Sequence, residues 1–275
     1  MDEQVARIQK RIAEITERIE RAAQAASRPA GQVRLVVVTK SQPVEVVHAA
    51  VEAGASILGE NYPQESLPKI LALPKILALP KIQTLPNRPE PSNTAQQTEN
   101  QAAAKPAGPA WHMIGHLQSR KASIVADHFD MLQSLDSLQL AQRLERLVVE
   151  RDRVLPVLLE LNVGGEESKY GWPAWADADL DNLYADIDQI MAMPHLAVRG
   201  LMTMPPLYDD SDKTRPFFAR LRQISEALAK RLSSEYFTEL SMGTSADFEA
   251  AVMEGATLVR VGTAILGPRI PKAQL

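Results

Sequence analysis

The chain has 275 residues, of which 45% are hydrophobic and 23% are charged, as expected for a globular protein with one sizeable core. Its formal net charge of -4 argues against a nucleic-acid-binding surface, which needs clustered Lys and Arg. The sequence has no cysteine, which excludes disulfides, thiolate metal sites and a cysteine nucleophile. It starts with Met1-Asp2-Glu3 rather than a secretory signal and has no membrane-length apolar run, so we expect a cytoplasmic protein that binds no membrane.

The first part of the chain predicts a helix, a strand and a second helix. Isoleucines recur at three- and four-residue steps over residues 8–19, which is typical of an amphipathic helix, and this helix should end before Pro29. Residues 33–39 form a β-branched run with almost no alternation, as in a strand buried on both faces of a parallel sheet. Residues 43–53 then predict a helix that opens with proline and closes at Gly54.

The same alternation of strand and helix continues along the chain. Seven further strands are predicted at Ser56–Glu60, Trp111–Gly115, Met131–Leu135, Leu155–Val163, Ala197–Thr203, Tyr236–Ser241 and Thr257–Gly262. Helical patterns separate them, most clearly at 137–151, 216–231 and 246–254. The pattern predicts an α/β protein, a single (β/α)8 TIM barrel with an extra N-terminal helix. The alternative is an open doubly wound sheet, which usually has a Gly-rich first turn, whereas residues 39–42 contain no glycine.

Residues 68–110 interrupt this pattern. The sequence LPKILA occupies 67–72, repeats at 73–78 and is followed by LPKIQT at 79–84. Proline every six residues disfavours a continuous helix, and residues 87–110 are almost free of large apolar side chains. We therefore predict a disordered, low-complexity insertion at 68–110 within a single domain spanning 1–275. A tolerated surface-loop expansion is favoured over a partner-docking motif, because loop-closure entropy grows slowly with length.

In a barrel of this kind the functional site lies at the C-terminal ends of the strands. The residues expected there are Lys40, Glu60, Asn61, His116, Asn162, Ser241, Gly243, Ser245, Arg260, Gly262 and Thr263. Lys40 directly follows a buried strand, so its stem should emerge from the core, where desolvation lowers the pKa of an amine and favours imine formation. Considered alone, it would more often be a solvated or salt-bridged lysine. We interpret His116 as a helix cap and the methionines at 202 and 204 as packing residues.

Two neighbouring turns favour a binding site. The turn at 241–245 joins a strand to a helix with glycine and hydroxyl side chains, and Gly262-Thr263 supplies a second small-residue turn at the adjoining strand end. Such turns can cradle a phosphate. Helix capping by Ser245 explains the first turn equally well, but two adjacent turns favour phosphate. Arg260 either points into the barrel mouth or pairs with a carboxylate such as Glu60.

Six segments resemble, in order and spacing, the pyridoxal phosphate homeostasis protein family: VVVTKSQP, GENYPQE, WHMIGHLQSRK, LNVGGEESKYG, RGLMTM and SMGTSADFEAAVMEGATLVRVGTAILG. The resemblance spans 33–267 apart from the insertion. It implies a barrel like the N-terminal domain of alanine racemase and pyridoxal 5'-phosphate held as a Schiff base on Lys40. It also implies phosphate contacts from both turns and an arginine, Arg260, against the pyridine nitrogen. The implied cofactor-binding set is Lys40, Asn61, Ser241, Gly243, Ser245, Arg260, Gly262 and Thr263, with no catalytic residue and no metal.

The resemblance also implies a function. We expect a monomeric protein of vitamin B6 homeostasis that holds the cofactor and delivers it to apo-enzymes. The chain ends at Leu275, so we expect it to lack the C-terminal β domain that supplies the second catalytic base of alanine racemases. Two alternatives stay open: a pyridoxal-phosphate-dependent, racemase-like enzyme, and a barrel that acts as an interaction scaffold through its insertion. Pro63 and Thr244 depart from the residues that relatives more often carry.

Overall fold

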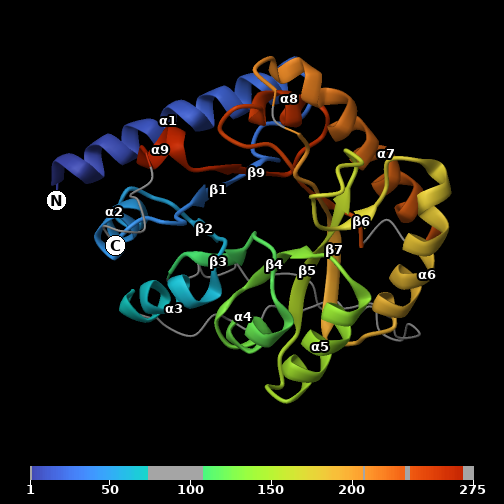
Figure 1. Ribbon diagram of the computed structural model, residues 1–275. Helices are drawn as coiled ribbons and strands as arrows, with labels where there is room; N and C mark the ends of the chain where they lie inside the picture. The colour runs from blue at the N-terminus through green and yellow to red at the C-terminus, as the bar shows by residue number, and fades with distance from the viewer. Residues whose placement is uncertain (1, 74–107, 207, 233–235, 269–275) are drawn as a thin grey trace, which may run out of the picture.

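The computed structural model describes residues 2–73, 108–206, 208–232 and 236–268, and its strands form a closed barrel (Figure 1). The strands are β1 Arg34–Val38, β2 Ile57–Glu60, β3 Ala110–Met113, β4 Met131–Leu135, β5 Leu155–Asn162, β7 Leu196–Met202, β8 Glu239–Ser241 and β9 Leu258–Val261. They follow the order β4-β3-β2-β1-β9-β8-β7-β5, and a β4–β5 pairing closes the ring. All these pairings are parallel. The predicted (β/α)8 barrel is confirmed.

Helices surround the ring. They are α1 Asp2–Ala25, α2 Val44–Glu52, α3 Pro63–Ala72, α4 Ala122–His128, α5 Leu138–Val149, α6 Leu180–Met191, α7 Arg215–Arg231, α8 Phe248–Met253 and α9 Thr263–Leu266, with 3-10 turns at Ser119–Lys121, Asp177–Asp179 and Ser211–Thr214. The two-residue β6, Trp172–Pro173, pairs with the end of β5. In the ranges that the structure describes, no helix is both long and apolar enough to cross a membrane.

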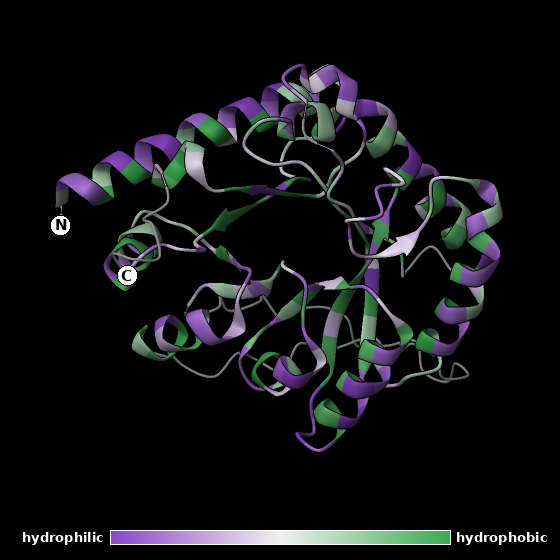
Figure 2. Ribbon diagram, viewed as in Figure 1, coloured by the Kyte–Doolittle hydropathy of each residue, from purple (hydrophilic) through white to green (hydrophobic). Residues whose placement is uncertain are grey.

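The extra N-terminal helix is present as predicted. Hydrophobic and hydrophilic residues alternate along α1 (Figure 2), and its buried side chains are Ile8, Ile15, Ile19 and Ala23. These residues recur at helical spacing, so one face packs against the barrel helices α2, α8 and α9 while the charged face meets solvent. The helix thereby covers the side of the barrel that carries β1 and β9 (Figure 1).

The barrel interior changes from apolar to polar along the strands. Its apolar cluster contains Val36, Ile57, Met131, Leu158, Met202 and Leu258. Two residues further along three of these strands come Gln133, Glu160 and Arg260, which point to the same side because strand side chains alternate. All three are buried. The end of the barrel nearest the strand C-termini therefore encloses polar and charged groups.

The structure moves the start of the predicted insertion. Helix α3 continues to Ala72 with Pro68 inside it, so the first LPKILA copy is helical rather than disordered. Pro68 removes one backbone N–H, but Lys69, Ile70 and Leu73 are buried, and their packing offsets that loss. At the other end β3 already begins at Ala110. The rest of the predicted insertion, 74–107, lies outside the described residues.

Candidate functional site

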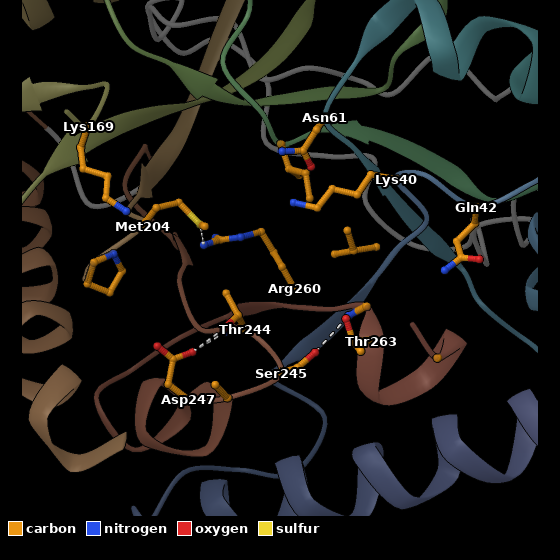
Figure 3. Close-up of a pocket in the computed structure, with 16 residues that line it drawn as sticks. Lys40, Gln42, Asn61, Lys169, Met204, Thr244, Ser245, Asp247, Arg260 and Thr263 are labelled. Atoms are coloured by element: carbon orange, nitrogen blue, oxygen red, sulfur yellow. Dashed lines mark hydrogen bonds between the residues drawn. The ribbon is translucent and has the colours of Figure 1, made fainter. Parts of the chain in front are cut away.

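A cavity of about 300 Å³ opens at the C-terminal ends of the strands (Figure 3). Its lining consists of Val38, Lys40, Gln42, Asn61, Ile114, Lys169, Met204, Pro205, Thr244, Ser245, Ala246, Asp247, Arg260, Gly262, Thr263 and Gly267. Six of the eight residues in the implied cofactor-binding set are among them, namely Lys40, Asn61, Ser245, Arg260, Gly262 and Thr263. Ser241 and Gly243 lie behind this lining. The cavity therefore brings together residues from both ends of the chain.

The end of β1 presents Lys40. Thr39, directly before it, is fully buried, and its hydroxyl donates to Glu60 Oε1 at 2.8 Å. The chain then turns through Ser41, whose φ of 56° lies in the left-handed region that non-glycine residues seldom adopt. The amine of Lys40 points into the cavity from the side of Asn61 (Figure 3). The sequence placed Lys40 correctly but carried no signal for this turn.

Glu60 does not pair with Arg260. Its Oε1 lies 2.8 Å from Lys69 Nζ, which also donates to the Thr39 carbonyl at 2.9 Å. Burial raises the pKa of Glu60 although Lys69 and the Thr39 hydroxyl act in the opposite direction. The expected alternative of an Arg260–Glu60 salt bridge is therefore wrong. Lys69 was missed because its proline-spaced repeat was assigned to the insertion.

Arg260 reaches the cavity from inside the barrel. Its Nη1 donates to Ser241 Oγ at 2.5 Å, and its Nη2 donates to the Thr203 carbonyl at 2.8 Å and approaches Met204 Sδ at 2.9 Å. Burial lowers the pKa of Arg260 to about 10, while Glu160 and Asp247 counteract that shift. The guanidinium is therefore still charged near neutral pH, and it carries its charge on the cavity wall.

The two small-residue turns lie opposite Lys40 in the cavity (Figure 3). The Gly262 N–H donates to Ser245 Oγ at 3.3 Å, so the hydroxyl proton of Ser245 can itself be donated. Asp247 Oδ1 accepts from the N–H of Thr244 at 2.6 Å and from its hydroxyl at 2.9 Å. The side-chain acceptor within this turn is thus Asp247, and Ser245 does not cap α8, whose N-cap residue is Asp247. Ser245 and the Gly262-Thr263 turn face the cavity.

Gly243 and Ser241 act behind these turns. Gly243 has a φ of 90°, and a Cβ there would lie 2.6 Å from the Ala251 Cβ, so this position requires glycine. The Ser241 hydroxyl is fully buried and donates to Gln133 Oε1 at 2.6 Å. These two residues therefore shape the first turn and support Arg260.

Asn61 offers an unused acceptor at the cavity wall. Its Oδ1 is buried and has no hydrogen-bond partner among the described residues. A Cβ at Gly115 would lie 2.7–2.8 Å from Asn61 atoms, so the glycine gives this side chain its space. A buried polar atom without a partner costs free energy, which a bound donor would recover.

Other strand-end residues have different roles. His116 is not a helix cap, because its Nδ1 lies 2.6 Å from Asp136 Oδ2 and its ring stacks on Tyr170 at 3.6 Å. Asn162 donates to the Glu166 carbonyl at 2.8 Å and closes the following loop. The sequence did not single out four other residues as lining the cavity, namely Gln42, Lys169, Met204 and Asp247. All four lie in the quoted motifs, and Gln42 and Met204 follow the ends of β1 and β7 closely enough to have been found.

The chain is similar to known proteins along most of its length. Residues 11–269 match the family described as alanine racemase, N-terminal domain. A pyridoxal phosphate homeostasis protein of Pasteurella multocida (strain Pm70) is 34% identical over 262 residues, which are 95% of this chain and 97% of that one. The chain belongs to the pyridoxal phosphate homeostasis protein family. The family predicted from the six motifs is thus confirmed.

Solved structures of similar fold agree with this family assignment. A structure described as an unknown protein from Bifidobacterium adolescentis has a TM-score of 0.79 and 32% identity, covering 96% of each chain. PipY of Synechococcus elongatus PCC7942, solved with PLP bound, has a TM-score of 0.68 and 31% identity, covering 91% of this chain and 100% of that one. No cluster of His, Asp and Glu that could hold a metal is present among the described residues.

Proposed function

We propose that this protein binds pyridoxal 5'-phosphate as a Schiff base on Lys40 and serves vitamin B6 homeostasis by holding the cofactor and delivering it to apo-enzymes. One observation carries the proposal: the Lys40 amine, the Arg260 side chain and the Ser245 and Gly262-Thr263 turn converge on one cavity (Figure 3). The names of the relatives, and the PLP bound in PipY, support the choice of cofactor.

The residues present suit this cofactor. The cavity of about 300 Å³ is in the range of small-molecule sites, and nine of its sixteen lining residues carry polar or charged side chains. Ser245 and Thr263 offer hydroxyls for a phosphate, and the orphaned Asn61 oxygen suits a ring substituent that can donate a hydrogen bond. When bound, the cofactor supplies an aldehyde and an electron-accepting ring.

The residues of the cavity suit the holding of the cofactor better than the turnover of amino acids. Lys40 condenses with the aldehyde and releases water, and a phosphate fixed across the cavity keeps the two groups within reach. Arg260 stays protonated, so its charge disfavours a proton on a nitrogen that faces it. A neutral ring nitrogen is a weak electron sink. We therefore propose that the protein turns over amino acids negligibly and acts as a monomeric carrier.

The test is trapping of the bound cofactor. Borohydride reduction of the protein loaded with pyridoxal phosphate, followed by peptide mass spectrometry, should place the label on the peptide containing Lys40 and not on the one containing Lys169. Lys40→Ala should lose the trappable adduct and keep weaker, noncovalent binding. An absence of any imine absorbance in the wild type would refute the proposal and support the scaffold alternative.

The racemase-like alternative has its own test. Incubation of the loaded protein with L-alanine and other amino acids, followed by chiral analysis, should show no racemisation at ordinary enzyme rates. Rapid racemisation or decarboxylation would replace the carrier role with an enzymatic one. Racemisation requires proton donors on both faces of the reacting carbon.

A further inference from the structure

A line of hydrogen bonds crosses the inside of the barrel behind the cavity. Arg260 on β9 donates to Ser241 on β8 at 2.5 Å, Ser241 donates to Gln133 on β4 at 2.6 Å, and Gln133 lies 2.8 Å from His112 Nδ1 on β3. Arg260 and His112 are 3% and 5% exposed, and the two residues between them are fully buried. Only the arginine end of this line reaches the cavity.

The chemistry of each group sets the direction of the line. A guanidinium has donors only, so Ser241 Oγ accepts from Arg260 and must direct its own proton to Gln133 Oε1. The amide of Gln133 then turns its N–H towards His112, whose Nδ1 must be an unprotonated acceptor. His112 is therefore the neutral Nε2–H tautomer. Burial, with a smaller effect of Arg34, lowers the pKa of His112 to about 3, which agrees with that state.

We propose that Gln133 and His112 are positioning residues that hold the Arg260 guanidinium in place at the wall of the cofactor cavity. Without them the Ser241 hydroxyl can rotate, and its proton would then face the donors of Arg260. With them, a lone pair of Ser241 is held towards Nη1 while the Thr203 carbonyl holds Nη2. The effect on cofactor binding rests on the proposed function, whereas the orientation of Arg260 does not.

The surroundings explain why a line of this kind is needed. The adjacent interior layer is apolar, so an arginine in the barrel finds few acceptors unless the strands supply them. Fully satisfied polar networks in such surroundings fix one arrangement of the core. The line also joins β3, β4, β8 and β9, so the orientation of one cavity residue depends on four strands.

The experiment measures the tautomer of His112 and the rotation of the Arg260 guanidinium in the cofactor-free protein. Nitrogen NMR of the wild type should show His112 as the Nε2–H tautomer and separate, slowly exchanging guanidinium signals for Arg260, assigned with Arg260→Lys. In Gln133→Met the Arg260 signals should average through faster rotation. His112→Leu, a second variant on another strand, should have the same effect to a smaller degree. The matched control is Ser225→Ala, which removes another buried hydroxyl, one that donates to the Phe237 carbonyl at 3.3 Å, and should leave Arg260 unchanged.

Cofactor binding gives the second readout. Gln133→Met should weaken the affinity for pyridoxal phosphate about ten-fold and shift the absorption of the bound cofactor, because Ser241 is then no longer held as the acceptor of the charged Arg260. An Nδ1–H tautomer in the wild type, or unchanged Arg260 signals in both variants, would overturn the inference. A wild type that forms no imine on Lys40 would instead refute the proposed function and leave the NMR result standing.

Discussion

Lys69 Nζ lies 2.8 Å from Glu60 Oε1, and both side chains are buried beside the strand end that carries Lys40. Lys69 also donates to the Thr39 carbonyl, the group directly before Lys40 in the chain. A residue of the first LPKILA copy thus holds the backbone that presents Lys40. The second Glu60 oxygen has no hydrogen-bond partner among the described residues. The positive charge of Lys69 therefore compensates the buried carboxylate through the first oxygen alone.

Lys69→Met should destabilise the fold by about 3–5 kcal/mol, because it leaves the Glu60 charge buried and uncompensated. The free energy of unfolding, from urea titration, is the measurement. Lys10→Met is the matched control, since Lys10 is 79% exposed, lies 3.9 Å from Glu14 and should change stability by less than about 0.5 kcal/mol. Equal losses in the two variants would contradict the role given to Lys69.

Two deletions separate the fold from the insertion. Replacing residues 74–107 with a short Gly-Ser bridge should leave folding and cofactor binding intact, because loop closure depends weakly on length. Deleting 68–110 in the same way should cost several kcal/mol, roughly the loss of Lys69 plus that of a buried Ile70. The midpoint temperatures of thermal unfolding of the two deletion proteins, compared with the wild type, are the measurement. Equal stability would show that the end of α3 contributes nothing, and a large loss in the shorter deletion would show that 74–107 is structural.

Glu160 should make the stability of the cofactor-free protein depend on pH. Burial, helped by the charge of Asp136, raises its pKa from 4.5 to about 7, although Arg260 and Lys169 oppose the shift. The folded protein thus holds the Glu160 proton more tightly than the unfolded chain does. The resulting stabilisation, about 3 kcal/mol, is lost as the pH rises from the unfolded pKa of 4.5 through the folded pKa of about 7. Glu160→Gln should remove that loss. Urea titrations of both proteins from about pH 5 to about pH 8 isolate the effect of Glu160, since other groups titrate alike in the two. If the stability of the two proteins changed with pH in parallel, the raised pKa of Glu160 would be contradicted.

Arg260→Glu should change the spectrum of the bound cofactor, because a carboxylate favours a proton on the facing ring nitrogen where arginine disfavours it. The new carboxylate also faces the Thr203 carbonyl that Arg260 now donates to, so stability should fall by roughly 3 kcal/mol. Arg260→Gln is the control, since it removes the charge without reversing it and should give an intermediate spectrum. Absorbance of protein loaded with pyridoxal phosphate is the measurement. An unchanged spectrum in Arg260→Glu would show that Arg260 does not face the ring.

The sequence by itself determined the barrel and six of the sixteen residues that line the cavity. A β-branched run without alternation indicates a strand buried on both faces, and the residue that follows such a strand must emerge at the barrel mouth. This local rule placed Lys40 and Asn61 at the cavity, and strand alternation placed Arg260 on the same face as Gly262. Their convergence on one cavity follows from the closure of parallel strands, which puts all the strand ends on one face.

Only the tertiary structure decided the partners of these residues. The sequence offered Glu60 as a partner of Arg260, but helix α3 brings Lys69 to Glu60 at the end of β2, although proline spacing argued against a helix there. The hydroxyl of Ser241 looked like a phosphate donor, but the interior of the barrel turns it towards Arg260 and Gln133. Sequence patterns report the face on which a side chain lies, since that depends on local periodicity. Its hydrogen-bond partner depends on which distant strand the closed barrel brings opposite to it.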